Sequence, residues 1–391
     1  MPAQDVHIIG AGIAGLTAAL ALSRQGRDVR IIDQAPELSE VGAGLQMSPN
    51  ASRILISLGL GEALDRALLR PARISLVSGH SLRKIAHVPC GGFAEQRWGA
   101  PYGVLHRADL QVMLLAAVRA DPRCHLELGT RTASADVKTL ADRDGAPSNP
   151  LVIGADGVWS QVRELVPDAA RPQFSGQVAW RFVMAADQAR PLLDTTNVSV
   201  FLAPHTHLVA YPLAGGELVN MVAIARGSDP GKTWAAAERP ADRQALLRDF
   251  ADWHPKITGL LRDVPEMSWW PLFSMPDGRW FDDRNIVLIG DAAHAMTPFA
   301  AQGAALAIED GYELALAVCA EETGPAASLG SFERSRRARI AKARSRAAFN
   351  RFAYHARGPI RLGRDVVLGL RRPESLAADL DWLYGYRSPG T

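Results

Sequence analysis

At 391 residues the chain is longer than one hydrophobic core usually supports, so we expect more than one domain. Hydrophobic residues make up 48% of the chain and charged residues 21%, a balance that is typical of a folded protein and excludes a disordered one. The formal net charge of +2 does not favour a nucleic-acid partner. No apolar run approaches the roughly 20 residues of a membrane span, so we expect no membrane association.

The three cysteines, Cys90, Cys124 and Cys319, are far apart and odd in number. Their spacing predicts neither a disulfide framework nor a zinc site, so we expect reduced thiols and no bound metal. The N-terminus leads directly into an apolar segment at Val6–Ile9, without a basic region or a cleavage signal. We therefore expect a cytoplasmic protein.

Three stretches of the chain predict strands of one parallel sheet. Val6–Ile9 is followed by an alanine-rich helix to about Arg24 and by a second strand over 29–32, which together form a βαβ unit. Residues 151–154 and 286–289 repeat the pattern of a short apolar strand that leads to an aspartate turn. Parallel strands deliver such turns to the carboxyl edge of the sheet, where α/β proteins bind their ligands.

The turn after the first strand contains the pattern GxGxxG, at Gly10, Gly12 and Gly15. Gly10 permits the tight turn, Gly12 lets the backbone approach a pyrophosphate, and Gly15 lets the helix pack on the strand. The free amides at the helix N-terminus favour phosphate. Asp33, at the end of the second strand, is placed to accept hydrogen bonds from an adenosine ribose. The turn predicts a dinucleotide site and leaves open which dinucleotide is bound.

The middle and the end of the chain have a different character. Residues 198–225 are short β-rich stretches, and the turn 214–217 joins two of them as an antiparallel hairpin. After Ser331 the chain is helix-like and basic from Arg334 through Arg346, which we interpret as a solvated or subunit-contacting face. The predicted fold is α/β, or α+β overall: a discontinuous Rossmann-like domain, an inserted antiparallel-sheet domain and C-terminal helices.

The two later aspartate turns show which family the chain resembles. Gly-Ala-Asp-Gly at 154–157 and Gly-Asp-Ala-Ala-His at 290–294, taken with the GxGxxG turn, are similar to the three fingerprints of the group A flavoprotein aromatic hydroxylases. Salicylate hydroxylase, 3-hydroxybenzoate 6-hydroxylase and 6-hydroxynicotinate 3-monooxygenase are the members that the chain most resembles, over nearly its whole length. It departs from the commonest pattern at Ala295, where proline usually follows the histidine.

The resemblance implies a bound FAD. Asp291 would bind its ribityl and ribose region, Asp156 would lie near the pyrophosphate, and Arg107 would contact the FAD chain. The helix that opens at Gln302 would direct its positive end at the flavin. The expected cofactor-binding residues are Gly10, Gly12, Ile13, Ala14, Gly15, Asp33, Gly44, Arg107, Asp156, Gly290, Asp291, Pro298, Gln302, Gly303 and Ala304. Taken alone, Asp156 and Asp291 have a second interpretation, which is helix capping after a strand.

His207 and Tyr211 lie four residues apart in a predicted strand, so both side chains point to one face. They match a histidine and a tyrosine that contact substrate in the resembled hydroxylases. We assign His207 as base or relay for a phenol proton and Tyr211 as a hydrogen-bond partner, and the alternative is ordinary sheet residues. Four strand steps span about 13 Å, so both reach one ring only from opposite ends or across a bent strand.

Five more residues are candidates for the substrate pocket: Gln46, Met47, Trp180, Arg181 and Phe299. A carboxylate substrate calls for an arginine, and Arg181 is the candidate. His294, which follows an aspartate turn, is expected to hold the loop near the flavin.

The resemblance implies an NAD(P)H-dependent FAD monooxygenase that uses O2, through a flavin hydroperoxide, to hydroxylate a small hydroxylated aromatic or heteroaromatic acid. Only one GxGxxG is present, so NADH or NADPH would visit transiently. Two alternatives stay open: a flavoprotein oxidoreductase of the same fold that acts on a larger hydrophobic, non-phenolic substrate, and a non-catalytic binding protein. We expect a monomer or a homodimer.

The expected domain boundaries follow from these motifs. The FAD-binding domain would comprise 1–72, 100–170 and 277–325, the substrate domain 73–99 and 171–276, and the C-terminal helical segment 326–391.

Overall fold

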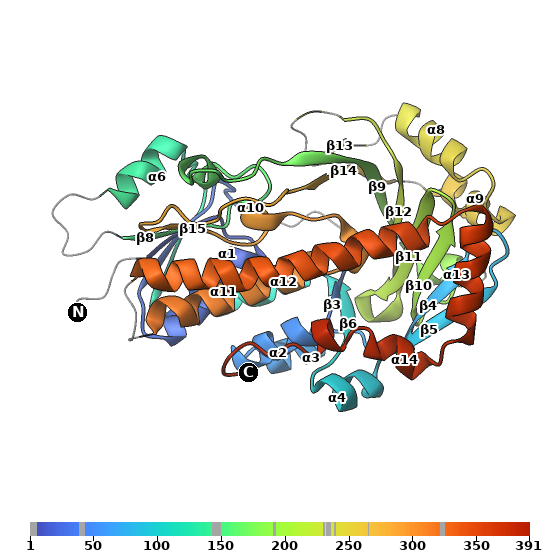
Figure 1. Ribbon diagram of the computed structural model, residues 1–391, viewed down its shortest axis with the longest axis horizontal. Helices are drawn as coiled ribbons and strands as arrows, with labels where there is room; N and C mark the ends of the chain where they lie inside the picture. The colour runs from blue at the N-terminus through green and yellow to red at the C-terminus, as the bar shows by residue number, and fades with distance from the viewer. Residues whose placement is uncertain are drawn as a thin grey trace.

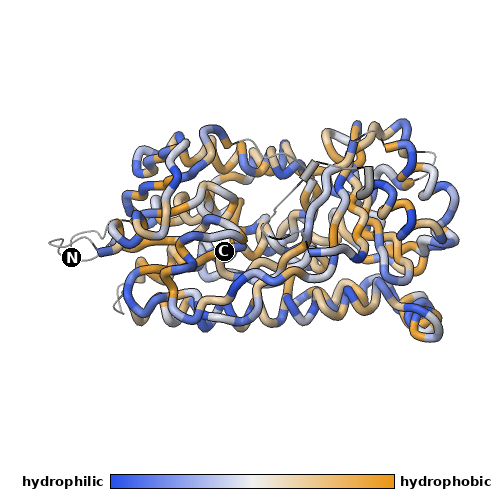
Figure 2. Tube along the Cα trace, turned by 90° about the horizontal axis from the view of Figure 1, so that it is seen from above, coloured by the Kyte–Doolittle hydropathy of each residue, from blue (hydrophilic) through white to orange (hydrophobic). Residues whose placement is uncertain are grey.

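The structure is a computed structural model that describes residues 6–38, 44–142, 150–190, 193–229, 231, 236–237, 240–264, 266–320 and 325–391. Two sheets lie in opposite halves of an elongated molecule, and one long helix runs past both (Figure 1). Each half has its own hydrophobic core. The outer helices alternate between hydrophobic and hydrophilic residues, as helices that cover a core do (Figure 2). The mixed architecture confirms the predicted fold class.

Within the part of the chain that the structure describes, the first sheet has five strands, and all its neighbouring pairs are parallel. In spatial order they are β15 (Ile286–Leu288), β8 (Leu151–Gly154), β1 (Val6–Ile9), β2 (Val29–Ile32) and β7 (Cys124–Glu127). The predicted βαβ unit and the two later strands therefore lie side by side, and their three turns meet at one edge of the sheet.

Helices α1 (Ile13–Arg24) and α11 (Gly303–Cys319) pack against each other over this sheet. A Cβ at Gly311 would come within 2.7 Å of the backbone nitrogen of Ala18, so the missing side chain permits the close approach. The other helices and short elements of this half are α2 (Pro49–Ser57), α3 (Gly61–Ala67), α5 (Arg107–Ala120), α6 (Ser134–Ala141), η1 (Val162–Leu165), α10 (Asp291–His294) and η3 (Pro298–Ala300).

The second sheet has eight strands in the described residues. In spatial order they are β13 (Ala236–Ala237), β14 (Ser268–Ser274), β9 (Gln173–Ala185), β12 (Leu218–Arg226), β11 (Thr206–Leu213), β10 (Val198–Ala203), β4 (Arg73–Ser78) and β5 (Lys84–Pro89). β11 and β12 are antiparallel and joined at 214–217 by η2 (Ala214–Gly216), which confirms the predicted hairpin.

The two faces of β11 have different surroundings. Leu208 and Ala210 point into the hydrophobic core beneath α8 (Pro240–Asp249) and α9 (Pro255–Asp263). His207 and Tyr211 have the opposite parity and lie on the other face, toward the first half of the molecule.

Smaller elements join the halves. β3 (Gly44–Met47) and β6 (Gly103–His106) form an antiparallel pair, and α4 (Gly92–Trp98) and α7 (Ala186–Ala189) lie in connections.

The C-terminal part is helical. α12 (Pro325–Tyr354) is the long helix that spans both halves (Figure 1), and α13 (Gly358–Leu370), α14 (Pro373–Ala378) and α15 (Asp381–Tyr384) follow it. Among the helices described, none combines the length and the apolar character that crossing a membrane requires.

Candidate active site

The glycines of the first turn have separate roles. Gly10 has a φ of +105°, and a Cβ there would overlap the carbonyl of Ala155 in the neighbouring turn. A Cβ at Gly15 would overlap the carbonyl of Gly10. At Gly12, by contrast, a Cβ would meet no atom within 4 Å. Gly10 and Gly15 are therefore required by packing within the protein, and Gly12 leaves open space beside the turn.

Two aspartates brace the turns at the edge of the sheet. Asp33 accepts hydrogen bonds from the Ala11 amide (2.6 Å) and the Ala35 amide (2.8 Å). Asp156 accepts hydrogen bonds through Oδ2 from the amides of Gln161 (2.6 Å) and Val162 (3.2 Å). Its Oδ1 is buried and has no hydrogen-bond partner among the described residues, and burial raises the pKa of this carboxyl. Asp156 thus holds the start of η1 through one oxygen and keeps the other as an unused acceptor.

A groove runs across these turns. It consists of one cavity of about 510 Å³ at the Asp33 end and a second of about 240 Å³ at the Gln302 end. The two cavities share lining residues, which makes them continuous: Gly12, Arg107, Ala155, Gly157 and Asp291.

Most of the predicted cofactor-binding residues line this groove: Gly10, Gly12, Ile13, Ala14, Asp33, Arg107, Asp156, Asp291, Pro298, Gln302, Gly303 and Ala304. Gly15, Gly44 and Gly290 lie outside its lining. Gly290 has a φ of +59° and would place a Cβ 2.9 Å from the Cβ of Ala14, so it shapes the turn from behind. Gly44 packs against Tyr211, whose Cε2 would be 2.6 Å from a Cβ.

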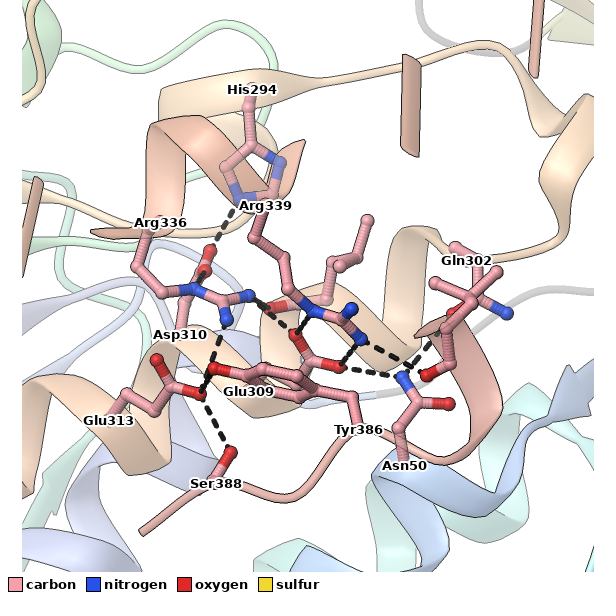
Figure 3. A network of polar contacts seen from close by, with 12 residues as sticks. Asn50, His294, Gln302, Glu309, Asp310, Glu313, Arg336, Arg339, Tyr386 and Ser388 are labelled. Carbon is pink, nitrogen blue, oxygen red and sulfur yellow. Dashed lines mark hydrogen bonds and ion pairs between the residues drawn. The ribbon is translucent and has the colours of Figure 1, made fainter. Parts of the chain in front are cut away.

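Gln302, the residue that precedes α11, is fixed by contacts with the start of α2. Its amide nitrogen donates to Ser48 Oγ at 3.1 Å, and its carbonyl oxygen accepts from Asn50 Nδ2 at 3.3 Å. The same Asn50 nitrogen lies 2.7 Å from Glu309 Oε1 (Figure 3). The side chain at the N-terminus of α11 is thus tied to a carboxylate two turns further along the helix.

Glu309 belongs to a buried network of charges between α11 and α12 (Figure 3). Arg336, with 0% of its side chain exposed, lies 2.8 Å from Glu309, 2.8 Å from Asp310 and 3.3 Å from Glu313. Arg339 forms a bidentate pair with Glu309 at 2.7 and 2.8 Å. The basic segment from Arg334 through Arg346 lies in α12, and we interpreted it as a solvated or subunit-contacting face. That interpretation is wrong for Arg336 and Arg339, which are buried counter-ions.

The network reaches the third glycine turn through Asp310. One carboxylate oxygen of Asp310 accepts from the Gly290 amide at 2.9 Å and contacts His294 Nε2. Burial alone would raise the pKa of Asp310, but the facing His294 and Arg336 lower it to about 2. Asp310 is therefore ionised and holds the turn that precedes Asp291. His294 has the loop-holding position that its sequence context suggested.

A third cavity, of about 450 Å³, lies between the second sheet and the C-terminal helices. It meets the groove at Pro298 and Ala301, which line both. Its other walls are largely apolar, with side chains from β4, β10, α12, α13 and the tail. We call it the ring cavity. Two predicted pocket residues, Gln46 and Phe299, line it.

His207 lines the ring cavity and is almost completely buried. Its Nδ1 lies 2.9 Å from Nε2 of His355, and its ring centroid lies 4.9 Å from that of Phe299. Burial, and then the adjacent His355, lower the pKa of His207 well below 6.5. Burial likewise lowers the pKa of His355 to about 4. Both imidazoles are therefore neutral near pH 7.

Among the described residues, the cations of the ring cavity outnumber their carboxylate partners by one, because Asp379 faces both Arg371 and Arg346. Arg364 pairs with Asp365 at 2.7 Å, and Arg371 forms a bidentate pair with Asp379. Arg346, from α12, has a buried Nε with no hydrogen-bond partner among the described residues. The wall thus carries one uncompensated positive charge in largely apolar surroundings, which favours an anion.

The remaining substrate candidates lie elsewhere. Tyr211 is buried beside Gly44 and does not line the ring cavity, in keeping with the long strand spacing. Met47 and Trp180 are in the hydrophobic cores of the two halves. Arg181 lines the groove, with its guanidinium 4.7 Å from the Trp270 ring centroid.

Comparison with known proteins shows the family of the chain. The sequence profile of the family described as FAD binding domain matches residues 3–347. The chain belongs to this family. 3-Hydroxybenzoate 6-hydroxylase 1 of Aquipseudomonas alcaligenes is 33% identical over 395 residues, with 98% of each chain covered. 6-Hydroxynicotinate 3-monooxygenase of Bordetella bronchiseptica is 33% identical over 313 residues, which cover 78% of this chain and 80% of that protein.

Solved structures show the same fold. Klebsiella pneumoniae HpxO complexed with FAD and uric acid superposes with a TM-score of 0.80 at 21% identity, covering 97% of this chain and 96% of that one. A salicylate hydroxylase substrate complex superposes with a TM-score of 0.77 at 24% identity, covering 98% and 96%. The predicted resemblance is confirmed, and this flavoprotein is a monooxygenase with FAD as cofactor.

The sequence did not predict the roles of four residues near the site: Arg346, His355 and the pair Arg336 and Arg339. For the pair a signal was present, because residues 303–319 are otherwise apolar and yet contain Glu309, Asp310 and Glu313. Buried acids on a helix require cations nearby. For His355 and Arg346 the sequence offers no comparable signal, because their role depends on how α12 lies against β11.

Proposed function

We propose that this flavoprotein uses NAD(P)H and O2 to hydroxylate a small aromatic or heteroaromatic acid. NAD(P)H supplies two electrons as a hydride. One oxygen atom of O2 enters the ring, and the other is released as water, which consumes one proton from solution. The observation that carries the proposal is the ring cavity, which places beside the groove a neutral buried histidine and an arginine whose Nε is buried without a hydrogen-bond partner among the described residues. The relatives named for hydroxybenzoate and hydroxynicotinate support the same substrate class.

The groove residues fit FAD. Gly12 leaves room for a pyrophosphate, Asp156 Oδ1 is an unused acceptor for a hydroxyl, and the N-terminus of the 17-residue helix α11 opens onto the second cavity. We assign Asp33 to the adenosine ribose, Arg107 and Asp156 to the centre of the chain, and Asp291 to the ribityl region. When bound, FAD supplies the redox chemistry and activates oxygen.

We assign the proton transfer to His207. Electrophilic hydroxylation needs an electron-rich ring, and loss of a phenol proton provides it. Burial disfavours the His207 cation, so we assign His207 as a relay: the neutral ring accepts the phenol proton at one nitrogen while Nδ1 donates to Nε2 of His355 at 2.9 Å. His355 is partly exposed and can pass a proton to solvent. Tyr211 lies outside the ring cavity, so we give it a supporting role behind Gly44 instead of direct contact with the substrate.

We assign the substrate carboxylate to Arg346 in place of Arg181. Arg346 lines the ring cavity, whereas Arg181 lines the groove. A carboxylate beside Arg346 would satisfy its buried Nε and cancel the charge of the wall.

The remaining expectations stay part of the proposal. The free thiols of Cys90, Cys124 and Cys319 favour a reducing compartment, so we place the enzyme in the cytoplasm. We keep the predicted domain boundaries, a monomer or homodimer, and no nucleic-acid or membrane partner.

The test is substrate-dependent oxidation of NADH and NADPH by the FAD-loaded protein, with products identified by mass. Salicylate, the hydroxybenzoates and the hydroxynicotinates are added singly. We expect one of them to accelerate oxidation and to gain one oxygen atom. If none does, and a larger neutral apolar compound does, the alternative of a hydrophobic non-phenolic substrate replaces the proposal. The exposed Phe349 and Val367 in the cavity wall mark where such a substrate would extend.

A further inference from the structure

A fourth cavity, of about 440 Å³, lies on the other side of α12 from the ring cavity. Its walls come from Ser175 in β9, Ser274 in β14, the loop 295–297, and α12. It shares Ala295 and Met296 with the flavin groove and shares no lining residue with the ring cavity. A molecule bound there would border the groove without competing for the substrate's space. We call it the outer cavity.

The polar groups of the outer cavity suit phosphate. Arg344 and Arg351, seven residues apart on α12, supply two cations, and Ser175, Ser274 and Thr297 supply hydroxyls. No carboxylate occurs in its described lining. Asp277, outside the lining, faces Arg344 but already pairs with Arg337 at 2.7 Å, so cations exceed carboxylates at this place. Arginines and hydroxyls that converge with such an excess of positive charge are the donor set that binds phosphate oxygens.

Two of these groups are unsatisfied in the folded chain. Ser175 Oγ is buried and lacks a hydrogen-bond partner in the described structure. Arg344 makes one long contact, from Nη2 to the Pro276 carbonyl at 3.4 Å, and burial lowers the pKa of its guanidinium. An anionic oxygen between them would satisfy both, because each has a donor to offer.

An aromatic ring lies at the rim of the same cavity. Phe352 is 59% exposed although it lines the outer cavity together with Arg351. A ring with one free face beside a cationic pocket provides a stacking platform for a planar base. Phosphate donors, an exposed ring and a border with the flavin groove occur together at this one place.

We propose that the outer cavity is the docking site for the reduced nicotinamide dinucleotide, with its phosphates at Arg344, Arg351 and Ser175. The inference rests on the proposed function, because it presumes that NAD(P)H is the reductant. It also gives a reason for the absence of a second GxGxxG: side chains of α12 replace a helix N-terminus as the phosphate site. α12 then presents residues 346, 350 and 353 to the substrate and residues 344, 348 and 351 to the reductant.

The direct test is equilibrium binding of NAD+, NADP+ and ADP-ribose to the oxidised holoenzyme by calorimetry. Wild type is compared with Arg351→Met, Ser175→Ala and the double variant Arg344→Met/Arg351→Met. Arg334→Met is the matched control, because Arg334 is an exposed arginine on the same helix outside the outer cavity. We expect dissociation constants to rise about tenfold for Arg351→Met and more for the double variant, with no change in the control.

Arg351 is exposed, so its substitution tests the site even if loss of the partly buried Arg344 impairs folding. Nucleotide affinities of Arg351→Met and of the double variant within twofold of wild type would overturn the proposal. Arg351 helps to lower the pKa of His355, so its loss could change the charge of that histidine. Nucleotide binding is therefore measured at pH 8, where His355 is neutral in wild type and variants alike.

Stopped-flow kinetics separate this inference from the proposed function. With NAD(P)H, reduction of the flavin in the variants should need more nucleotide for half-maximal rate. After photoreduction without nucleotide, oxygen and substrate should give wild-type product yields. If wild type hydroxylates a ring acid but the variants are reduced normally, the outer cavity is not the nucleotide site. If neither nucleotide reduces wild type, the proposed function itself fails.

Discussion

Replacing Arg346 by methionine removes the one uncompensated charge of the ring cavity and keeps the length of the side chain. The other two arginines of the wall are cancelled by Asp365 and Asp379, so the substitution takes the wall from a charge of +1 to zero. A charge-assisted hydrogen bond contributes about 1.5 to 3 kcal/mol, which corresponds to a roughly 10- to 150-fold rise in KM for a ring carboxylate. Stability should change little, because Arg346 makes no hydrogen bond in the described structure.

The assay compares each active hydroxyaromatic carboxylate with its carboxamide, which has nearly the same shape and no charge. Wild type should prefer the acid, and Arg346→Met should treat both compounds alike, with KM for the amide within about threefold of wild type. Arg334→Met provides the control for a charge lost from the same helix. Equal losses for acid and amide would mean that Arg346 shapes the cavity without binding the carboxylate, and the charge argument would be refuted.

Three other predictions follow from the groove, the network and the histidine pair. Gly12→Ala should leave the stability of the FAD-free protein near that of wild type but weaken FAD binding in fluorescence titrations. Gly15→Ala places a Cβ against the Gly10 carbonyl and should prevent correct folding. Equal behaviour of the two variants would contradict the assigned roles. Arg336→Met strands buried carboxylates and should cost about 3 to 5 kcal/mol in urea unfolding. Arg337→Met removes a surface pair with Asp277 at 2.7 Å and should cost at most about 1 kcal/mol. Because burial lowers the pKa of His355 to about 4, the native state stays neutral while the unfolded state binds a proton below pH 6.5, so stability is lost as pH falls through that window. Unfolding curves at pH 5 and pH 7 should therefore show that His355→Gln is less acid-sensitive than wild type by about 2 kcal/mol, and identical pH dependence would refute the shifted pKa.

The FAD half could be predicted from sequence because its determinants are local. A GxGxxG turn between an apolar strand and an alanine-rich helix specifies one geometry within about thirty residues. The hairpin at 214–217 and the shared face of His207 and Tyr211 follow from equally short-range rules. Alternation along a strand predicts which face of the sheet a side chain lies on, but not which cavity on that face it reaches. Tyr211 therefore lies on the predicted face and still outside the ring cavity.

The rest of the site depends on contacts between segments far apart in the chain. Arg336 and Arg346 belong to one basic helix, yet the first is a buried counter-ion of α11 and the second faces the ring cavity. Nothing in the helix itself distinguishes them, because the distinction comes from what packs on each face. Met47 and Trp180 illustrate the same limit for apolar residues, since the side chains that suit a substrate pocket also suit a core.

The buried network of charges between α11 and α12 also has a consequence for the order in which the enzyme is synthesised. Asp310 holds the turn before Asp291, but its counter-ion Arg336 follows it by 26 residues, and Glu313 is contacted by Tyr386 and Ser388 at the far end of the chain. A chain that has been synthesised only to the end of α11 contains these acids without their partners. The turn at Gly290 therefore gains its full set of contacts only after α12 has been synthesised.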